Sequence, residues 1–129
     1  MFNKRKFATG AGVVALAATM TLVGATAAYA GTDERIDVAG GEVTFTADGD
    51  YIDAYDLRKD GYCMTAELMI TNQPDYWTVS SCGYNTYHYR SLSFINEGAP
   101  VYIRACYTKK HSGGSYTRVK CSGWQGAHA

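Results

Sequence analysis

The sequence predicts an all-β protein, an antiparallel β-sandwich of about seven short strands that carries two disulfides. Short runs of alternating apolar and polar residues follow one another, turn signals separate them, and no helical period is found after residue 30. All four cysteines lie beyond residue 60. A domain of about a hundred residues buries a limited core, so cross-links matter to its stability.

The first thirty residues have the pattern of a signal peptide. A cationic start at 4–6 precedes an apolar stretch at 7–23, and Ala28-Tyr29-Ala30 matches a signal-peptidase site. We therefore expect a secreted, extracellular protein that starts at Gly31. Removal of residues 1–30 leaves nine basic and twelve acidic side chains, a net charge of −3. Such a domain has no general attraction to nucleic acid or membranes, and no motif indicates a cofactor.

Residues 31–41 are polar and acidic and end in Gly40-Gly41. This composition is typical of a flexible N-terminal arm, or of an added edge strand, in front of a β-sandwich domain at 42–129. An extended arm can add to the edge of a partner's sheet or fill a groove. Arg35 and Asp37 are therefore candidate partner-binding residues.

The first three predicted strands alternate clearly and end in turns. The strand at 42–46 stops at Asp48-Gly49-Asp50, and the strand at 51–55 stops before Lys59-Asp60-Gly61. The strand at 63–71 has the clearest pattern. Its two predicted faces are Met64, Ala66, Leu68 and Ile70 on one side and Cys63, Thr65, Glu67 and Thr71 on the other.

Four further strands complete the predicted sandwich. Trp77 and Val79 mark the fourth, which ends at Cys82. The fifth spans roughly 84–95. After a turn at Asn96-Glu97-Gly98, the remaining two lie around 101–105 and at 116–121.

An even number of cysteines in an exported chain of this length predicts two disulfides, and four cysteines allow three connectivities. A hairpin folded at Gly113-Gly114 places Cys106 opposite Cys121. Folding at the polar turn between the third and fourth strands brings Cys63 towards Cys82. Opposed strand residues have Cα separations that a disulfide bridges, so hairpin geometry favours these two pairs.

The fifth strand contains a conflict of faces. Strict alternation places Tyr87 and Tyr89 on one face, and Leu92 and Phe94 on the other. Either a bulge near Arg90 switches the faces, or the tyrosines are exposed. We expect Leu92 and Phe94 to face the core, with at least one tyrosine presented to solvent.

Exposed tyrosines beside an arginine make good contact surfaces, because aromatic and guanidinium groups dominate interface hot spots. The candidate partner-binding residues are therefore Tyr84, Tyr87, Tyr89 and Arg90, with Tyr76 and Trp77 as possible neighbours. The alternative is that these tyrosines simply pack on the sheet, since tyrosine suits a pleated surface.

Metal binding and catalysis are weaker hypotheses. No two cysteines have the spacing of a zinc knuckle. The aspartates between residues 48 and 60 suggest calcium, but a full set of ligand positions is missing and turn formation accounts for them. Of the three histidines, His88 alone has a structured setting, and no nucleophile motif accompanies it. We predict no catalytic or metal site.

Charge is unevenly distributed along the chain. Ten of the twelve acids lie between residues 33 and 67, whereas six basic and two acidic residues follow. This asymmetry indicates either two partner surfaces of opposite sign or charge pairing inside one sandwich. The second interpretation is the simpler one.

The order of several motifs carries a family resemblance. They are Gly41-Glu42-Val43-Thr44-Phe45, Asp60-Gly61, Glu97-Gly98, Val101, Arg104-Ala105-Cys106 and Cys121-Ser122-Gly123-Trp124. Together they resemble small exported β-sandwich proteins of streptomycete-type actinobacteria, some of which are similar to the adaptor subunit of umbrella toxin particles. That adaptor joins a lectin-like subunit to a large toxin-bearing subunit. The resemblance implies a non-enzymatic connector in an antibacterial complex, with those subunits as partners.

A second class of protein also resembles this chain. Actinobacteria export two-disulfide β proteins that inhibit amylases or proteases, and clusters of Trp, Tyr and Arg serve the amylase type. Tyr87-His88-Tyr89-Arg90 resembles such a cluster loosely. The expected function is therefore a secreted protein-binding module, either an adaptor or an inhibitor of an extracellular hydrolase.

Overall fold

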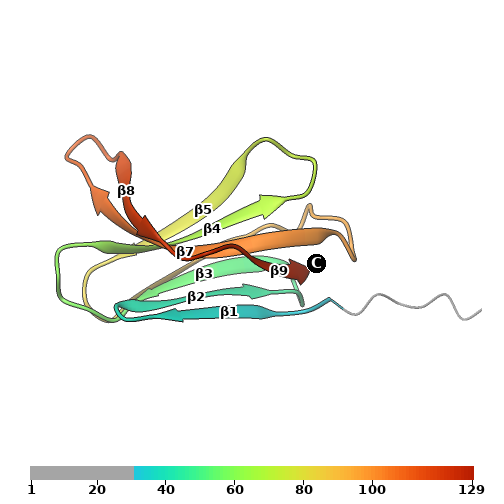
Figure 1. Ribbon diagram of the computed structural model, residues 1–129, viewed down its shortest axis with the longest axis horizontal. Helices are drawn as coiled ribbons and strands as arrows, with labels where there is room; N and C mark the ends of the chain where they lie inside the picture. Colours follow the sequence, from blue (N-terminus) through green and yellow to red (C-terminus); the bar gives the residue numbers. More distant parts are fainter. Residues whose placement is uncertain (1–30) are drawn as a thin grey trace, which may run out of the picture.

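The chain forms two antiparallel sheets that pack face to face, as a computed structural model shows for residues 31–129 (Figure 1). The predicted signal peptide, 1–30, lies outside the described residues. The strands are β1 (Glu34–Val38), β2 (Gly41–Thr46), β3 (Tyr51–Asp56), β4 (Cys63–Ile70), β5 (Tyr76–Cys82), β6 (Thr86–Ser91), β7 (Pro100–Lys110), β8 (Tyr116–Cys121) and β9 (Gln125–His128). Within 31–129 no helix is long and apolar enough to cross a membrane.

The four-stranded sheet has the order β1-β2-β3-β6, and the five-stranded sheet has the order β5-β4-β7-β8. β9 pairs with the first part of β7, and β8 pairs with its second part. The chain therefore crosses between the sheets after β3, after β5 and after β6.

The core lies between the two sheets and is built from their alternating inward side chains. Phe45, Ile52, Leu68 and Ile103 are fully buried there. Leu92, from the connection after β6, joins the same cluster. The predicted all-β sandwich class is confirmed, with nine strands in place of about seven.

The expectation of a flexible arm at 31–41 is wrong for most of that segment, and the alternative of an edge strand holds. β1 pairs with β2 over its whole length, and Ile36 is buried in the core. The close approach of other groups explains the glycines that follow. A Cβ on Gly41 would meet the carbonyl oxygen of Tyr55, and one on Gly40 would meet the ring of Tyr107.

Both predicted disulfides are present. Cys63 pairs with Cys82 across β4 and β5, and Cys106 pairs with Cys121 across β7 and β8. In each pair the residues lie directly opposite in the strand register, with Cα atoms 4.3 and 4.1 Å apart. Two disulfides are compatible with an extracellular protein.

The predicted fifth strand is shorter than expected, because β6 covers only part of 84–95. The conflict of faces resolves without a bulge in β6. Tyr87 and Tyr89 are both exposed, and Leu92 is buried, as predicted. The expectation for Phe94 is wrong: its side chain is 53% exposed and packs on Trp77 at the side of the sandwich.

Candidate binding surfaces

The outward face of the four-stranded sheet brings together four of the six predicted partner-binding residues. The strand register aligns two rows across the sheet: Arg35, Thr44, Asp53 and Tyr89 form one row, and Asp37, Glu42, Tyr55 and Tyr87 form the other. The sequence did not indicate that Arg35 and Asp37 share a face with the tyrosines, because that depends on the pairing of β1.

Four tyrosines from β3 and β6 form one continuous aromatic surface, which we call the tyrosine face: Tyr51, Tyr55, Tyr87 and Tyr89. Their rings meet edge to face or tilted, with centroids 6.3 to 6.4 Å apart. Tyr87 is 52% exposed and Tyr89 is 67% exposed. Such rings present a large apolar area together with hydroxyl groups that still reach water.

Asp53 lies beneath the tyrosine face. Its side chain is buried, and this burial raises its pKa, with a further contribution from Glu42 that Thr44 and Arg35 oppose. Burial also raises the pKa of Tyr87, and the charge of Asp53 acts in the same direction. The aromatic surface therefore covers a carboxyl group that is shielded from water.

An ion cluster occupies the part of the same face that β1 and β2 form. Arg35 contacts Asp37 at 3.0 Å and also pairs with Glu42. These acids raise the pKa of the Arg35 guanidinium, with Asp37 as the main cause. Because Arg35 and Asp37 are well exposed, the cluster contributes little to stability.

The other two predicted contact residues lie elsewhere. Arg90 points away from the tyrosine face, donates to the Thr78 carbonyl oxygen at 3.1 Å and stacks on Trp77 at 5.0 Å. Tyr84 lies in the turn between β5 and β6 and is 64% exposed. The expected single cluster is therefore divided into separate surfaces.

A second surface, a polar trough, lies on the outward face of the five-stranded sheet. The β4–β5 and β7–β8 hairpins both rise away from the four-stranded sheet (Figure 1). Side chains of β5 and β8 meet across this face, although β4 and β7 lie between these two strands. The Tyr116 hydroxyl lies 4.0 Å from Cys82 Sγ, and the Arg118 guanidinium lies 5.5 Å from the Tyr76 ring. The trough has a volume of about 720 Å³.

Glu67 lies at one end of the trough and is almost fully buried. Arg104 contacts one of its carboxylate oxygens at 2.6 Å, and Arg118 contacts the other at 2.5 Å. The Arg104 guanidinium also stacks on Trp124 at 4.3 Å. The charge pairing expected from the sequence is thus present here, between β4, β7 and β8.

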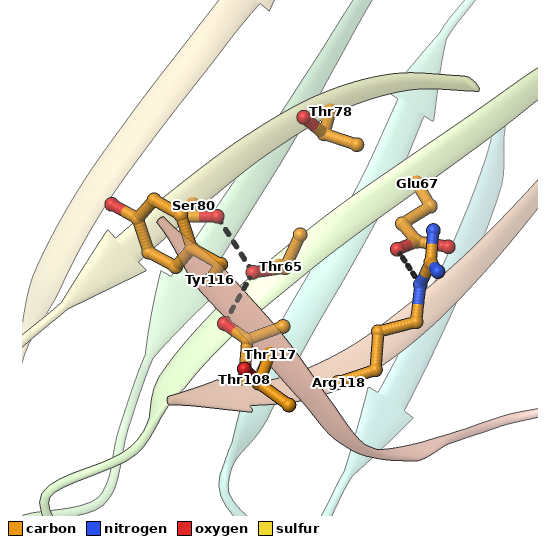
Figure 2. A pocket seen from close by; sticks show the side chains of 8 residues that line it. All are labelled: Thr65, Glu67, Thr78, Ser80, Thr108, Tyr116, Thr117 and Arg118. Atoms are coloured by element: carbon orange, nitrogen blue, oxygen red, sulfur yellow. Dashed lines mark hydrogen bonds and ion pairs between the residues drawn. The ribbon is translucent and has the colours of Figure 1, made fainter. Parts of the chain in front are cut away.

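Three hydroxyl groups form a chain along the trough, as Figure 2 shows. Thr65 Oγ1 lies 2.6 Å from Ser80 Oγ and 2.8 Å from Thr108 Oγ1. This site was not predicted from the sequence. The one signal of this site in the sequence is Glu67, an acidic residue in the middle of the most apolar strand. The trough itself forms because the hairpins of this sheet rise on both sides, and such a curl depends on tertiary structure.

His88, the histidine singled out from the sequence, contacts a serine hydroxyl. Ser81 Oγ contacts His88 Nδ1 at 3.2 Å, but Ser81 is fully buried and its hydroxyl also contacts Thr86. Among residues 31–129, one group of three metal-ligand side chains comes close together: Glu67 with Cys106 and Cys121. Both cysteines are in a disulfide, so this group is no free ligand set.

The fold and these surfaces define a small two-disulfide β-sandwich with two distinct outward faces. Comparison with protein-family models, curated proteins and solved structures finds no match for this chain.

Proposed function

We propose that this chain is a secreted, non-enzymatic protein-binding module, and that its partner docks on the tyrosine face. The observation that carries the proposal is the tyrosine face itself: four tyrosines lie side by side on a regular sheet, and two of them are more than half exposed. A sheet surface of this kind is rigid, so its contacts lose little conformational entropy on binding. Aromatic side chains are also the commonest hot-spot residues at protein interfaces.

The charge of this face indicates the chemistry of the partner. The two aligned rows contain three acidic residues and one basic residue, Arg35. The acids are Asp37, Glu42 and Asp53. A partner segment that carries Arg or Lys satisfies both properties of the surface: its cation stacks on the tyrosine rings, and it neutralises the acids. The partner is therefore a protein with basic side chains at its contact surface.

The resemblance to the umbrella-particle adaptor gives this proposal a specific form. In that form the chain connects a lectin-like subunit to a large toxin-bearing subunit in an antibacterial complex. Two separate faces suit a connector, because each can contact a different subunit.

A second candidate function is inhibition of an extracellular hydrolase, either an amylase or a protease. The cluster of Arg90, Trp77 and Phe94 favours it, since Phe94 is exposed and Arg90 stacks on the indole ring. This cluster lies at the side of the sandwich rather than on the tyrosine face.

A pull-down from the culture medium of the native organism, followed by mass spectrometry, tests both forms. We expect co-purification of lectin-like and repeat-containing secreted proteins for an adaptor. Recovery of a single hydrolase, together with loss of its activity, indicates an inhibitor. Bait that captures no secreted protein contradicts the proposal.

Variants identify the face that carries the contact. Tyr89→Ala is expected to weaken capture by roughly 2 kcal/mol or more, as for other hot-spot aromatics. Tyr62→Ala is the matched control, because Tyr62 is 39% exposed and lies in the connection between β3 and β4, outside both sheets. Equal losses for both variants, or no loss for Tyr89→Ala, would rule out the tyrosine face.

A further inference from the structure

The polar trough lies outside the tyrosine face, and its lining indicates what it can bind. Every side chain that lines it is polar or charged: Thr65, Glu67, Thr78, Ser80, Thr108, Tyr116, Thr117 and Arg118. A volume of about 720 Å³ lies within the range of roughly 300–1,000 Å³ that is usual for small-molecule sites. An apolar ligand would cover these polar groups without replacing their hydrogen bonds to water, which costs free energy.

The hydroxyl chain retains hydrogen-bonding capacity for a ligand. Each hydroxyl has one proton to donate and two lone pairs to accept. The contacts of Thr65 with Ser80 and Thr108 use two of the three protons. One donor and several lone pairs remain. Thr65 and Thr108 are buried, Ser80 is partly exposed, and the exposed Thr78 adds a further hydroxyl. This pattern matches a ligand whose own groups both donate and accept, as sugar hydroxyls do.

The charged groups of the trough largely balance one another. The Glu67 carboxylate is held from both sides by Arg104 and Arg118. The Arg118 side chain is 50% exposed, so part of its guanidinium can still donate to a ligand. The Glu67 carboxylate would repel a polyanion, and the two arginines would repel a cation. A neutral ligand fits this balance best.

One of the lining side chains is an aromatic ring. Tyr116 rises from β8 at the end near Ser80 (Figure 2). Tyr76, beyond the lining residues, holds the other end in place, because Arg118 and Arg104 stack on it and Trp124 packs against it. The C–H face of a sugar ring packs on an aromatic surface such as Tyr116, while its hydroxyls bond to the polar groups beside it.

Disulfides hold both walls of the trough in place. Cys82 lies next to Tyr116, and the sulfur atoms of Cys106 and Cys121 lie within 4.8 Å of a Glu67 carboxylate oxygen. A site held in this way loses little entropy on binding. We infer that the trough is a binding site for a short, uncharged saccharide of two or three units.

An NMR titration of the disulfide-bonded protein tests this site. The probes are cellotriose, xylotriose and triacetylchitotriose, with trigalacturonate as the anionic comparison, each up to about 10 mM, which covers millimolar affinities. We expect at least one neutral trisaccharide to cause saturable amide shifts at Thr78, Ser80, Tyr116 and Arg118. We also expect it to bind more tightly than trigalacturonate.

Two substitutions near the surface of the trough localise the binding. Thr78→Val removes a hydroxyl with little change of shape, and about a threefold to tenfold loss of affinity is expected for one hydrogen bond. Tyr116→Ala removes the ring, with an expected loss of about tenfold. Val119→Ala is the control on the same strand, because Val119 is exposed but does not line the trough.

Several results would overturn the inference. These are the absence of saturable shifts with all three neutral probes, shifts confined to the tyrosine face, or binding of trigalacturonate alone. The inference would also be wrong if an extended peptide bound specifically in the trough and no saccharide did. Thermal melts of the variants show whether a lost affinity reflects lost folding.

Discussion

Asp50 is an acid whose environment opposes its charge. Its side chain is 5% exposed, and Oδ1 has no hydrogen-bond partner among the described residues. Burial raises the pKa of this carboxyl, and the nearby charge of Glu97 adds to the effect. Its backbone is left-handed, with φ at 46°, a conformation that Asp and Asn tolerate better than most residues.

We predict that Asp50→Asn stabilises the protein at neutral pH. The folded-state pKa of Asp50 lies above its unfolded value, so the folded protein binds more protons and its stability falls as pH rises through that pKa. The neutral amide removes this dependence and keeps the left-handed backbone. The variant's advantage, on the order of 1 kcal/mol, should be present at pH 7 and vanish towards pH 4. Thermal melts across this range measure it, and an equal advantage at both ends would contradict the explanation.

The two apolar residues that follow β6 differ in their environment, which predicts different effects of truncation. Leu92→Ala should lower the free energy of unfolding by about 2–5 kcal/mol, because Leu92 is fully buried. Phe94→Ala should cost clearly less, since more than half of its side chain is exposed. Urea unfolding of the two variants measures both values. Equal losses would place Phe94 in the core after all.

Among the strands, β1 is an integral part of the fold, so loss of its core contact should lower the free energy of unfolding. Ile36 inserts into the core from this edge strand. We predict that Ile36→Ala destabilises the protein by about 2–5 kcal/mol. Arg35→Ala on the same strand is the control, because its side chain is 58% exposed and its loss should have little effect. An unchanged melting temperature for Ile36→Ala would mean that β1 is dispensable.

The strands that the sequence predicted well are those with strong alternation. β4 and β8 were found because apolar alternation or cysteine position marked them. β9 was missed, and for β1 an edge strand was only the alternative to a flexible arm, because both segments are short and mostly polar. Their pairing with β7 and β2 is what makes them strands. Turn signals located the hairpins well enough to give both disulfide pairs.

The candidate site was predictable only where local alternation decides exposure. That Tyr87 and Tyr89 face outward followed from their conflict with Leu92. Arg90 was grouped with them by its position in the chain, although adjacent strand residues point to opposite faces. The polar trough depends on the curl of a whole sheet, and no pattern within one strand reports it.

At the scale of the whole molecule, the disulfides are the simplest test of the fold. Non-reducing peptide mapping should link Cys63 to Cys82 and Cys106 to Cys121. Replacing either pair with Ala should lower the free energy of unfolding by about 2–5 kcal/mol. Chemical denaturation of each double variant measures this loss. A peptide that links Cys63 to Cys106 would contradict the strand register.

Each disulfide also joins neighbouring strands of one hairpin, so neither ties the two sheets together. This has a mechanical consequence. When the chain is pulled from its ends, the loops between paired cysteines, with separations of 19 and 15 residues, stay closed and bear no load. The loops do not overlap, so reduction should lengthen the fully stretched chain by roughly 34 residue intervals, or about 12 nm. The four-stranded sheet, which has no such clamp, should extend by the same amount in both redox states.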